Sequence, residues 1–294
     1  MPLPFDPSTL ARYGGLGFVA KTVVEGFLTG VHKSPYKGYS VEFAEHRQYY
    51  PGDEIRHIDW RVLGKTDRYY IKEYEEETNL KAYLLVDASG SMAYRGKRRS
   101  KYEYAQHVTA CLAYLMLQQL DAVGLVTLDT RIRQVLPPRA NAKHLLRILR
   151  VLEHTHPGGE TALAPLWHEL AAHHLRRRGL VIILSDCFDE MDDLLRAIRH
   201  FRHRKHEVIL FHVLAKEEIE FPFQRLTQFH DLELAPHKLL VDPARLRREY
   251  LERFNEFCQT LRDRVRAIGV DYHLLRTDEP VDRALGIYLS RRQR

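Results

Sequence analysis

From residue 80 onward the sequence alternates between short apolar runs and amphipathic helical stretches, and this alternation limits the possible folds more than any other feature. Apolar runs predict strands at 80–86, 123–128, 180–184, 208–214 and 270–275. A helical spacing of apolar residues predicts helices at 101–119, 140–152, 161–176, 189–203, 243–268 and 280–289. Strands that alternate with helices form a mostly parallel sheet covered on both faces. We therefore expect residues 80–294 to form a doubly wound α/β domain.

Residues 1–79 do not follow this rhythm. Turn-forming and charged residues are frequent over 34–67, and short alternating stretches at 39–43 and 69–74 are typical of strands. Apolar residues between 10 and 30 have a helical spacing, but several glycines interrupt it. We expect residues 1–79 to be a small β-rich N-terminal region that precedes the main domain.

Local signals inside the main domain predict two hairpins and the ends of two helices. The strand 123–128 connects to an expected strand at 131–136 through a tight turn, and short extended runs at 231–234 and 238–241 predict a second hairpin. Asp189 is a plausible N-cap for the helix that follows it. Asp242 and Pro243 begin the long helix, and Gly269 ends it.

Cysteine usage and hydropathy bear on location. The three cysteines, Cys111, Cys187 and Cys258, are far apart and form no paired motif, so neither a disulfide framework nor a zinc site is predicted. This pattern is typical of a reducing compartment. No apolar run reaches the length of about 18–20 residues that a membrane span needs, and the N-terminus lacks a signal-peptide pattern. We expect a cytoplasmic protein with no membrane span.

Polar side chains follow two of the predicted strands, and a third group lies between them. Asp87, Ser89 and Ser91 follow the strand 80–86, Thr161 follows a Gly-Gly pair, and Asp186 follows the strand 180–184. Taken alone, these residues are typical of Asx or Ser turns and of a helix cap. Ligands of open α/β sheets bind at the carboxyl ends of the strands, where all five residues should meet. Carboxylates and hydroxyls supply the oxygen ligands that Mg²⁺ or Mn²⁺ prefers.

The order and spacing of these five residues resemble the metal-ion-dependent adhesion site of von Willebrand factor A domains. The resemblance implies that Ser89, Ser91 and Thr161 lie closest to the metal, and that Asp87 and Asp186 act directly or through water. Because neutral hydroxyls leave a divalent cation short of anionic ligands, we expect a carboxylate from another protein to complete the site.

Upstream residues resemble the signature of the domain of unknown function 58 family. The stretches that carry the resemblance are 38–43, 47–53 and 56–60, and the likeness covers roughly residues 34–215. It implies an adaptor that works with a MoxR-type AAA+ ATPase in the assembly or maturation of a target protein complex, with the target supplying the acidic ligand. The charged and aromatic residues over 47–60 fit either a structural ion-pair network or a partner-binding surface.

Other functions receive less support from the sequence. The chain has no Walker A motif, no GxSxG elbow and no HExxH helix, so we expect no enzymatic activity. A metal-dependent phosphohydrolase that used Asp87 is one alternative, although Ser89 stands where haloacid-dehalogenase-type enzymes carry a second aspartate. Basic patches at 95–101 and 196–206 make nucleic-acid binding another alternative, but a formal net charge of +6 is modest for that function.

Overall fold

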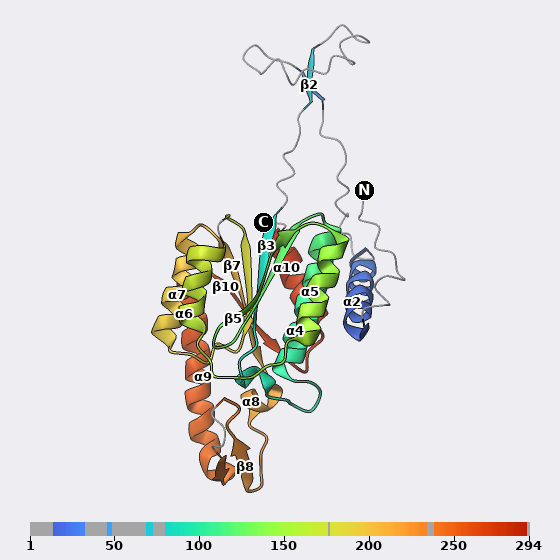
Figure 1. The fold of residues 1–294 in the computed structure, drawn as a ribbon. Helices are drawn as coiled ribbons and strands as arrows, with labels where there is room; N and C mark the ends of the chain where they lie inside the picture. Colours follow the sequence, from blue (N-terminus) through green and yellow to red (C-terminus); the bar gives the residue numbers. More distant parts are fainter. Residues whose placement is uncertain are drawn as a thin grey trace. The chain divides into compact units, whose positions relative to one another are not determined.

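The central element of the computed structural model is a six-stranded sheet with the strand order β10-β7-β6-β3-β4-β5 (Figure 1). Its strands are β3 (Lys81–Asp87), β4 (Ala122–Leu128), β5 (Ile132–Arg139), β6 (Leu180–Ser185), β7 (Glu207–Leu214) and β10 (Asp271–Arg276). All neighbouring strands are parallel except β4 and β5, which form the predicted antiparallel hairpin. The prediction of a mostly parallel, doubly wound α/β sheet is therefore confirmed.

The structure describes residues 14–32, 46–48, 69–72, 80–175, 177–233 and 238–292. The chain divides into two compact units, one formed by Met1–Leu28 with Leu80–Arg294 and the other by Thr29–Asn79. In the smaller unit, β1 (His46–Gln48) pairs antiparallel with β2 (Tyr70–Lys72). The strand expected at 39–43, and residues 49–60 of the charged and aromatic stretch 47–60, lie outside the described residues.

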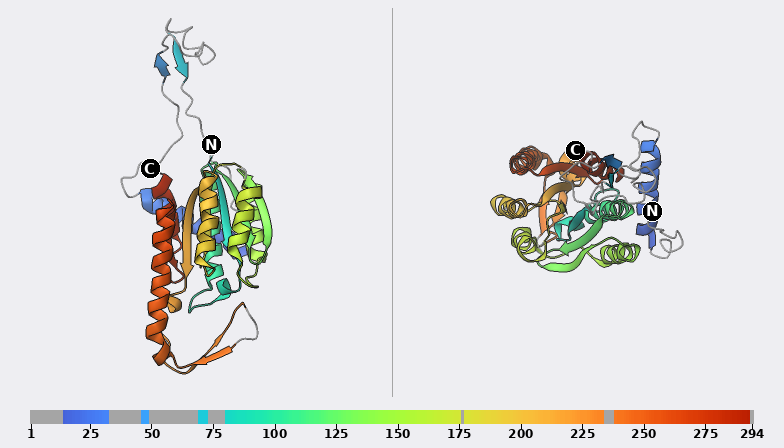
Figure 2. Two further views of the ribbon diagram at one scale, coloured as in Figure 1. Left: turned by 90° about the vertical axis from the view of Figure 1, so that its left-hand side faces the viewer. Right: turned by 90° about the horizontal axis from the view of Figure 1, so that it is seen from above.

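Helices cover both faces of the sheet because successive strand residues point to opposite sides. In β3, Leu84 belongs to the core on one face and Leu85 to the core on the other. One face is covered by α4 (Lys101–Gln118), α5 (Ala142–His154) and α10 (Asp282–Arg292), and the other by α6 (Leu163–Glu169), α7 (Met191–His203) and α9 (Pro243–Ala267) (Figures 1 and 2).

Helix α2 (Gly14–His32) belongs in part to the α/β unit, which differs from the domain division expected from the sequence. Its residues Leu16, Ala20 and Val24 are buried in the core that α4 and α10 also form. Their spacing places them on one face of the helix. The apolar face of α2 therefore packs within the α/β unit. The second unit begins near residue 29 and ends at the expected boundary, residue 79.

Three local predictions differ from the structure. The helix expected over 161–176 begins only at Leu163 and changes into a π-helical turn at Leu170–His174. The expected N-cap, Asp189, instead accepts a hydrogen bond from Ala164 N at 3.0 Å, so its carboxylate caps α6 rather than α7. The second hairpin pairs β8 (Thr227–His230) with β9 (Lys238–Val241), so its first strand precedes the expected run 231–234.

The ends of the long helix agree with the sequence signals. Asp242 accepts a hydrogen bond from Ala244 N, Pro243 occupies the first turn, and Gly269 adopts a positive φ of 76° just beyond the helix. A positive φ is accessible to glycine because it has no Cβ. Within the described parts of the chain, no helix is both long enough and apolar enough to cross a bilayer.

We expect Val24→Asp to lower the free energy of unfolding by about 3–5 kcal/mol, the usual cost of an uncompensated buried charge. The matched control is Phe18→Asp on the same helix, because Phe18 is 63% exposed whereas Val24 is 0% exposed. The control should change stability by no more than about 0.5 kcal/mol. Urea denaturation of both variants measures the difference, and equal effects would contradict the docking of α2.

Candidate functional site

Asp87 and Ser185 lie side by side where β3 and β6 end. The parallel register pairs Val86 with Leu184, so the next residue of each strand reaches the same edge of the sheet. Ser185 Oγ donates a hydrogen bond to Asp87 Oδ2 at 2.6 Å, and Ser89 N donates to Asp87 Oδ1 at 2.8 Å. Asp87 is only 2% exposed, so its carboxylate is held in one orientation within the protein.

The two serines after β3 present their hydroxyls together. Ser89 Oγ and Ser91 Oγ are 3.1 Å apart, with Ser89 buried and Ser91 half-buried. Octahedral Mg²⁺ holds its oxygens at about 2.0–2.1 Å, which places neighbouring ligands about 2.9 Å from each other. The spacing of the two hydroxyls therefore fits adjacent positions around such an ion.

The loop that carries Ser89 and Ser91 is called the serine loop below. Backbone hydrogen bonds join it to the loop that carries Thr161. Gly90 N donates to Gly159 O at 2.9 Å, and Gly158 N donates to Ala88 O at 3.0 Å. These bonds bring Thr161 to the edge at which Ser89 and Ser91 lie. Thr161 does not cap α6, because the N-cap position is Ala162 and has no side-chain hydrogen bond.

Thr161 instead contacts a carboxylate from a distant part of the chain. Its Oγ1 donates a short hydrogen bond to Glu233 Oε1, and its backbone N donates to Glu233 Oε2 at 3.1 Å. Glu233 follows β8 and lies 72 residues further along the chain. Glu233 could not be predicted as a neighbour of Thr161, because no local sequence pattern links the two segments.

A buried lysine neutralises the second predicted carboxylate. Lys101 Nζ lies 2.6 Å from Asp186 Oδ2 and 2.7 Å from Glu218 Oε1, and Lys101 is 1% exposed. Lys101 begins α4, whereas Glu218 belongs to the short helix α8 (Lys216–Glu220). The Lys101–Asp186–Glu218 cluster therefore ties the first turn of α4 and the end of β6 to α8.

Burial and mutual repulsion shift the protonation of the site carboxyls. Burial, followed by the negative charge of Asp186, raises the pKa of Asp87 to about 7. Burial also raises the pKa of Glu218, against the opposing effect of Lys101. Burial alone would lower the pKa of Lys101, but the charges of Asp186 and Glu218 raise it above its ordinary value. Without a further cation, Asp87 in the folded protein therefore keeps its proton up to a pH near 7.

A buried histidine supports the backbone beside Asp186. His212 Nε2 lies 2.9 Å from the Asp186 carbonyl oxygen, and His212 Nδ1 lies 2.7 Å from the Tyr272 hydroxyl. Burial lowers the pKa of His212 to about 4, so the imidazole is neutral near pH 7. A neutral ring satisfies both contacts if Nε2 donates to the carbonyl and Nδ1 accepts from the hydroxyl.

The donor set fits a hydroxyl-rich metal site. In the described residues, no three or more His, Cys, Asp or Glu side chains are grouped so that they could hold a metal. The groups that could hold one are the hydroxyls of Ser89, Ser91 and Thr161, with the two aspartates behind them. Of the five predicted residues, Asp87, Ser89 and Ser91 are joined by hydrogen bonds among themselves. Thr161 lies on a loop that backbone hydrogen bonds join to theirs, and Asp186 pairs with Lys101.

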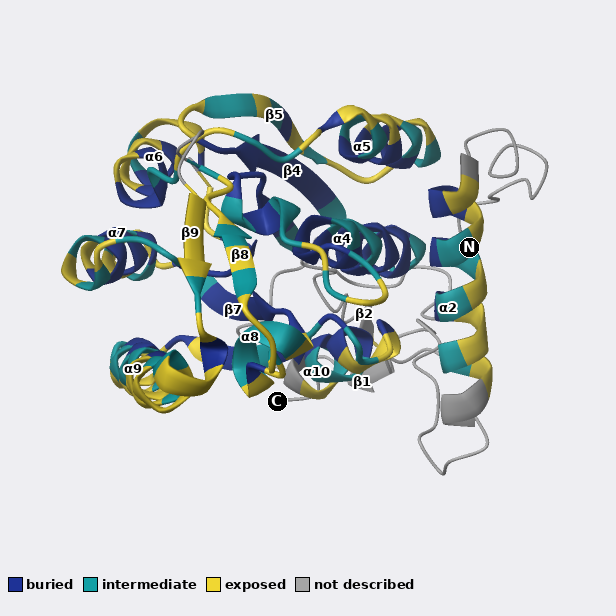
Figure 3. Ribbon diagram, turned by 90° about the horizontal axis from the view of Figure 1, so that it is seen from below, coloured by how far each residue is buried: buried dark blue, intermediate teal, exposed yellow. Residues whose placement is uncertain are grey.

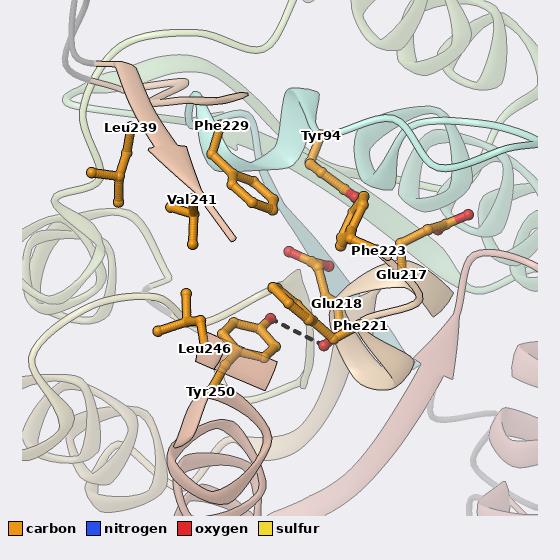
Figure 4. Close-up of a pocket in the computed structure, with 10 residues that line it drawn as sticks. All are labelled: Tyr94, Glu217, Glu218, Phe221, Phe223, Phe229, Leu239, Val241, Leu246 and Tyr250. Atoms are coloured by element: carbon orange, nitrogen blue, oxygen red, sulfur yellow. Dashed lines mark hydrogen bonds between the residues drawn. The ribbon is translucent and has the colours of Figure 1, made fainter. Parts of the chain in front are cut away.

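An aromatic pocket lies next to the Lys101–Asp186–Glu218 cluster, between α8, α9 and the β8–β9 hairpin (Figure 4). Its cavity measures about 240 Å³ and shares Glu218 with the Lys101–Asp186–Glu218 cluster. The Tyr250 hydroxyl donates to the Glu218 carbonyl oxygen at 3.0 Å, and its ring lies 4.5 Å from the Phe221 ring, centre to centre. The lining residues are Tyr94, Glu217, Glu218, Phe221, Phe223, Phe229, Leu239, Val241, Leu246 and Tyr250.

Several side chains of the basic patches 95–101 and 196–206 make contacts within the chain or are buried. In 95–101, Arg95 pairs with Glu103 at 2.8 Å and Lys101 is buried. In 196–206, Arg196 pairs with Asp193, and both Phe201 and His206 are buried. Fewer side chains of these patches are therefore free to contact phosphates than the sequence suggests.

Stability of the metal-free protein should fall as pH rises from about 4 to about 7, since the pKa of Asp87 is raised from its ordinary value of 3.8 to about 7 in the folded state. In this window the folded chain binds more protons than the unfolded chain, which contributes a slope of about −1.4 kcal/mol per pH unit. Asp87→Asn should remove this contribution, as measured by urea denaturation in EDTA.

The control for this measurement is Asp129→Asn, which changes another buried aspartate next to a strand end. Asp129 pairs with Arg133. The Asp129→Asn variant should therefore keep the pH dependence of the unfolding free energy that the unmodified chain shows, even if its overall stability is lower. A slope that survives Asp87→Asn would contradict the assignment to Asp87.

The chain is similar in sequence to known bacterial proteins over most or about half of its length. The chain is 26% identical over 277 residues to the uncharacterized protein Rv1480 of Mycobacterium tuberculosis, a match that covers 93% of this chain and 86% of the relative. It is 22% identical over 157 residues to the uncharacterized protein YeaD of Bacillus subtilis, with 53% of this chain and 37% of that protein covered.

Solved structures show a similar fold. An aerotolerance-related membrane protein from Bacteroides fragilis matches with a TM-score of 0.53 at 14% identity, covering 73% of this chain and 100% of that chain. The conserved hypothetical protein BatB from Bacteroides thetaiotaomicron matches with a TM-score of 0.50 at 15% identity, covering 73% of this chain and 98% of that chain. The sequence profile of the DUF58 family, described as proteins of unknown function, matches residues 45–257. The chain therefore belongs to the DUF58 family.

Proposed function

We propose that this protein is a non-enzymatic adaptor that binds other proteins through a Mg²⁺ or Mn²⁺ site at the carboxyl edge of its sheet. The observation that carries the proposal is the pairing of the Ser89 and Ser91 hydroxyls on a loop that backbone hydrogen bonds join to the loop of Thr161, beside the buried Asp87 and Asp186. When bound, the metal would supply a position that attracts a carboxylate from a partner protein. Ser89, Ser91 and Thr161 would hold the metal, and the two aspartates would balance its charge.

The surroundings of Asp87 support a binding role over a phosphohydrolase role. Both carboxylate oxygens already accept hydrogen bonds, one from Ser185 Oγ and one from Ser89 N. A nucleophile needs an oxygen that can reach the reacting atom. The 2% exposure of Asp87 therefore suits a residue that orders ligands better than one that attacks a substrate.

The identity of the partners rests on membership of the DUF58 family. The resemblance stated from the sequence implies a MoxR-type AAA+ ATPase as one partner and a target complex, undergoing assembly or maturation, as the other. The acidic side chain that completes the site would come from the target. A cytoplasmic location remains a prediction from cysteine usage and hydropathy.

We expect Thr161→Val to weaken Mg²⁺ or Mn²⁺ binding by about tenfold or more, because it removes an oxygen ligand while preserving the shape of the side chain. The matched control is Thr130→Val, an exposed threonine in the turn next to Gly159. Isothermal titration of both variants and the unmodified chain measures the difference. Absence of metal binding by the unmodified chain, or binding that survives Asp87→Ala, would overturn the metal site.

Capture experiments test the partner. A MoxR-type ATPase from the same cells should co-purify with the tagged chain in Mg²⁺, and the target protein should be lost in EDTA or with Asp87→Ala. The Asp129→Asn variant serves as the control that retains the metal ligands. Failure to recover any AAA+ ATPase would count against this partner, while turnover of a phosphate ester that Asp87→Ala abolishes would favour the phosphohydrolase.

A further inference from the structure

Glu233 places a carboxylate directly against Thr161, one of the residues that the proposed function assigns to the metal. Both of its oxygens accept hydrogen bonds from Thr161, one from the hydroxyl and one from the backbone N–H. Its own backbone N donates to Asp231 Oδ1 at 2.8 Å, which fixes the direction of the residue. The carboxylate therefore faces the Thr161 hydroxyl that the proposed function assigns to the metal.

The segment around Glu233 lies directly against the serine loop. A Cβ atom on Gly90 would lie 2.3 Å from Leu232 O and 2.8 Å from Gly159 O, so only glycine permits this close approach. Gly90 stands between Ser89 and Ser91. The segment 231–233 therefore contacts the serine loop through Leu232 and the Thr161 loop through Glu233.

The hairpin that carries Glu233 is held less firmly than the sheet beneath it. Strands β8 and β9 pair only with each other among the described strands, and their residues are exposed or half-buried (Figure 3). Leu239 and Leu240 are 63% and 61% exposed. A lone two-stranded hairpin is marginally stable in water, so it can move at a smaller cost than a core strand.

Aromatic packing anchors the inner side of the hairpin. Phe229 of β8 lies 6.0 Å from Phe221 and 5.2 Å from Phe223, measured between ring centres (Figure 4). The cavity of about 240 Å³ beside these rings leaves space between the hairpin and α9. Ring contacts of Phe229 therefore hold β8, while the contacts of Leu232 with Gly90 and of Glu233 with Thr161 hold the segment that follows it.

We propose that Glu233 is the chain's own ligand for the metal, and that a partner's acidic side chain binds by taking its place. This inference rests on the proposed function, since it needs a metal at Thr161. Glu233 is then a sixth residue of the proposed metal site, beside the five predicted from the sequence. Because it is tethered through the β8–β9 hairpin, it competes with the partner's carboxylate for the metal. The partner is then an acidic residue on an accessible segment, because it must enter as the hairpin withdraws.

Tethering makes Glu233 a strong competitor. A carboxylate on the same chain acts at an effective concentration of about millimolar or higher, so a free carboxylate at a lower concentration cannot displace it. A protein partner can do so if additional contacts, such as those with the exposed leucines of the hairpin, favour the displaced state. Recognition would therefore require both an acidic residue and an adjoining apolar surface.

Mn²⁺ binding by the full chain tests the inference, with Glu233→Gln as the variant and Glu160→Gln as the matched control. Glu160 is exposed and precedes Thr161 directly, so its change removes the same charge close to the site without removing the Thr161 contact. Glu233→Gln should weaken Mn²⁺ binding by about tenfold or more, and Glu160→Gln by at most about threefold. Water-proton relaxation should show one more water on the Mn²⁺ bound to Glu233→Gln.

Acetate then serves as the probe for the incoming carboxylate. It should lower the water-proton relaxation of Mn²⁺ bound to Glu233→Gln by replacing that water, and leave the unmodified chain and Glu160→Gln unchanged. Equal Mn²⁺ affinity, hydration and acetate response in all three proteins would overturn the role of Glu233 and leave the metal site standing. Absence of Mn²⁺ binding by the unmodified chain would overturn the proposed function, and this inference with it. Thermal unfolding in EDTA confirms that each variant is folded.

Discussion

The ion pair between Lys101 and Asp186 holds the candidate site together. Asp186 follows β6 and is fully buried, so its charge needs a partner within the protein. Lys101 supplies one and engages Glu218 at the same time, which links α4, the sheet edge and α8 through one ammonium group. Replacing Lys101 would leave two carboxylates without a cation in the interior, whereas replacing Asp186 or Glu218 would leave one ion pair. The position of Asp186 after β6 and that of Glu218 beside the aromatic pocket therefore depend on the same buried cation.

Charge balance also explains the choice of ligands at this edge. Two carboxylates, Asp87 and Asp186, stand close enough to raise the pKa of Asp87, and only one of them has a lysine. Further carboxylates around the proposed metal would add to this repulsion, whereas serine and threonine hydroxyls do not. In the proposed site the extra negative charge would come from Glu233, which contacts Thr161 and follows β8 of a hairpin outside the sheet.

Most of the fold could be predicted because its signals are local. The apolar runs of β3, β4, β6, β7 and β10 and the caps of α9 involve residues that are close in sequence. Prediction from local sequence failed where one residue or helix could contact either of two elements. Asp189 suits the N-terminus of α7 by position, yet α6 is packed against α7 and takes its carboxylate. Helix α2 showed a helical spacing, but its partner lies beyond the intervening residues 29–79.

The sequence by itself determined the sheet, the strand ends and hence the edge at which the five predicted residues would meet. It did so because periodicity and capping act over a few residues, and because parallel strands place their carboxyl ends together. Only the tertiary structure decided which groups face those residues. Lys101 and Asp186 are 85 positions apart, and Thr161 and Glu233 are 72 apart. Such pairs have no local pattern, since their contact exists only once helices and hairpin have packed against the edge of the sheet.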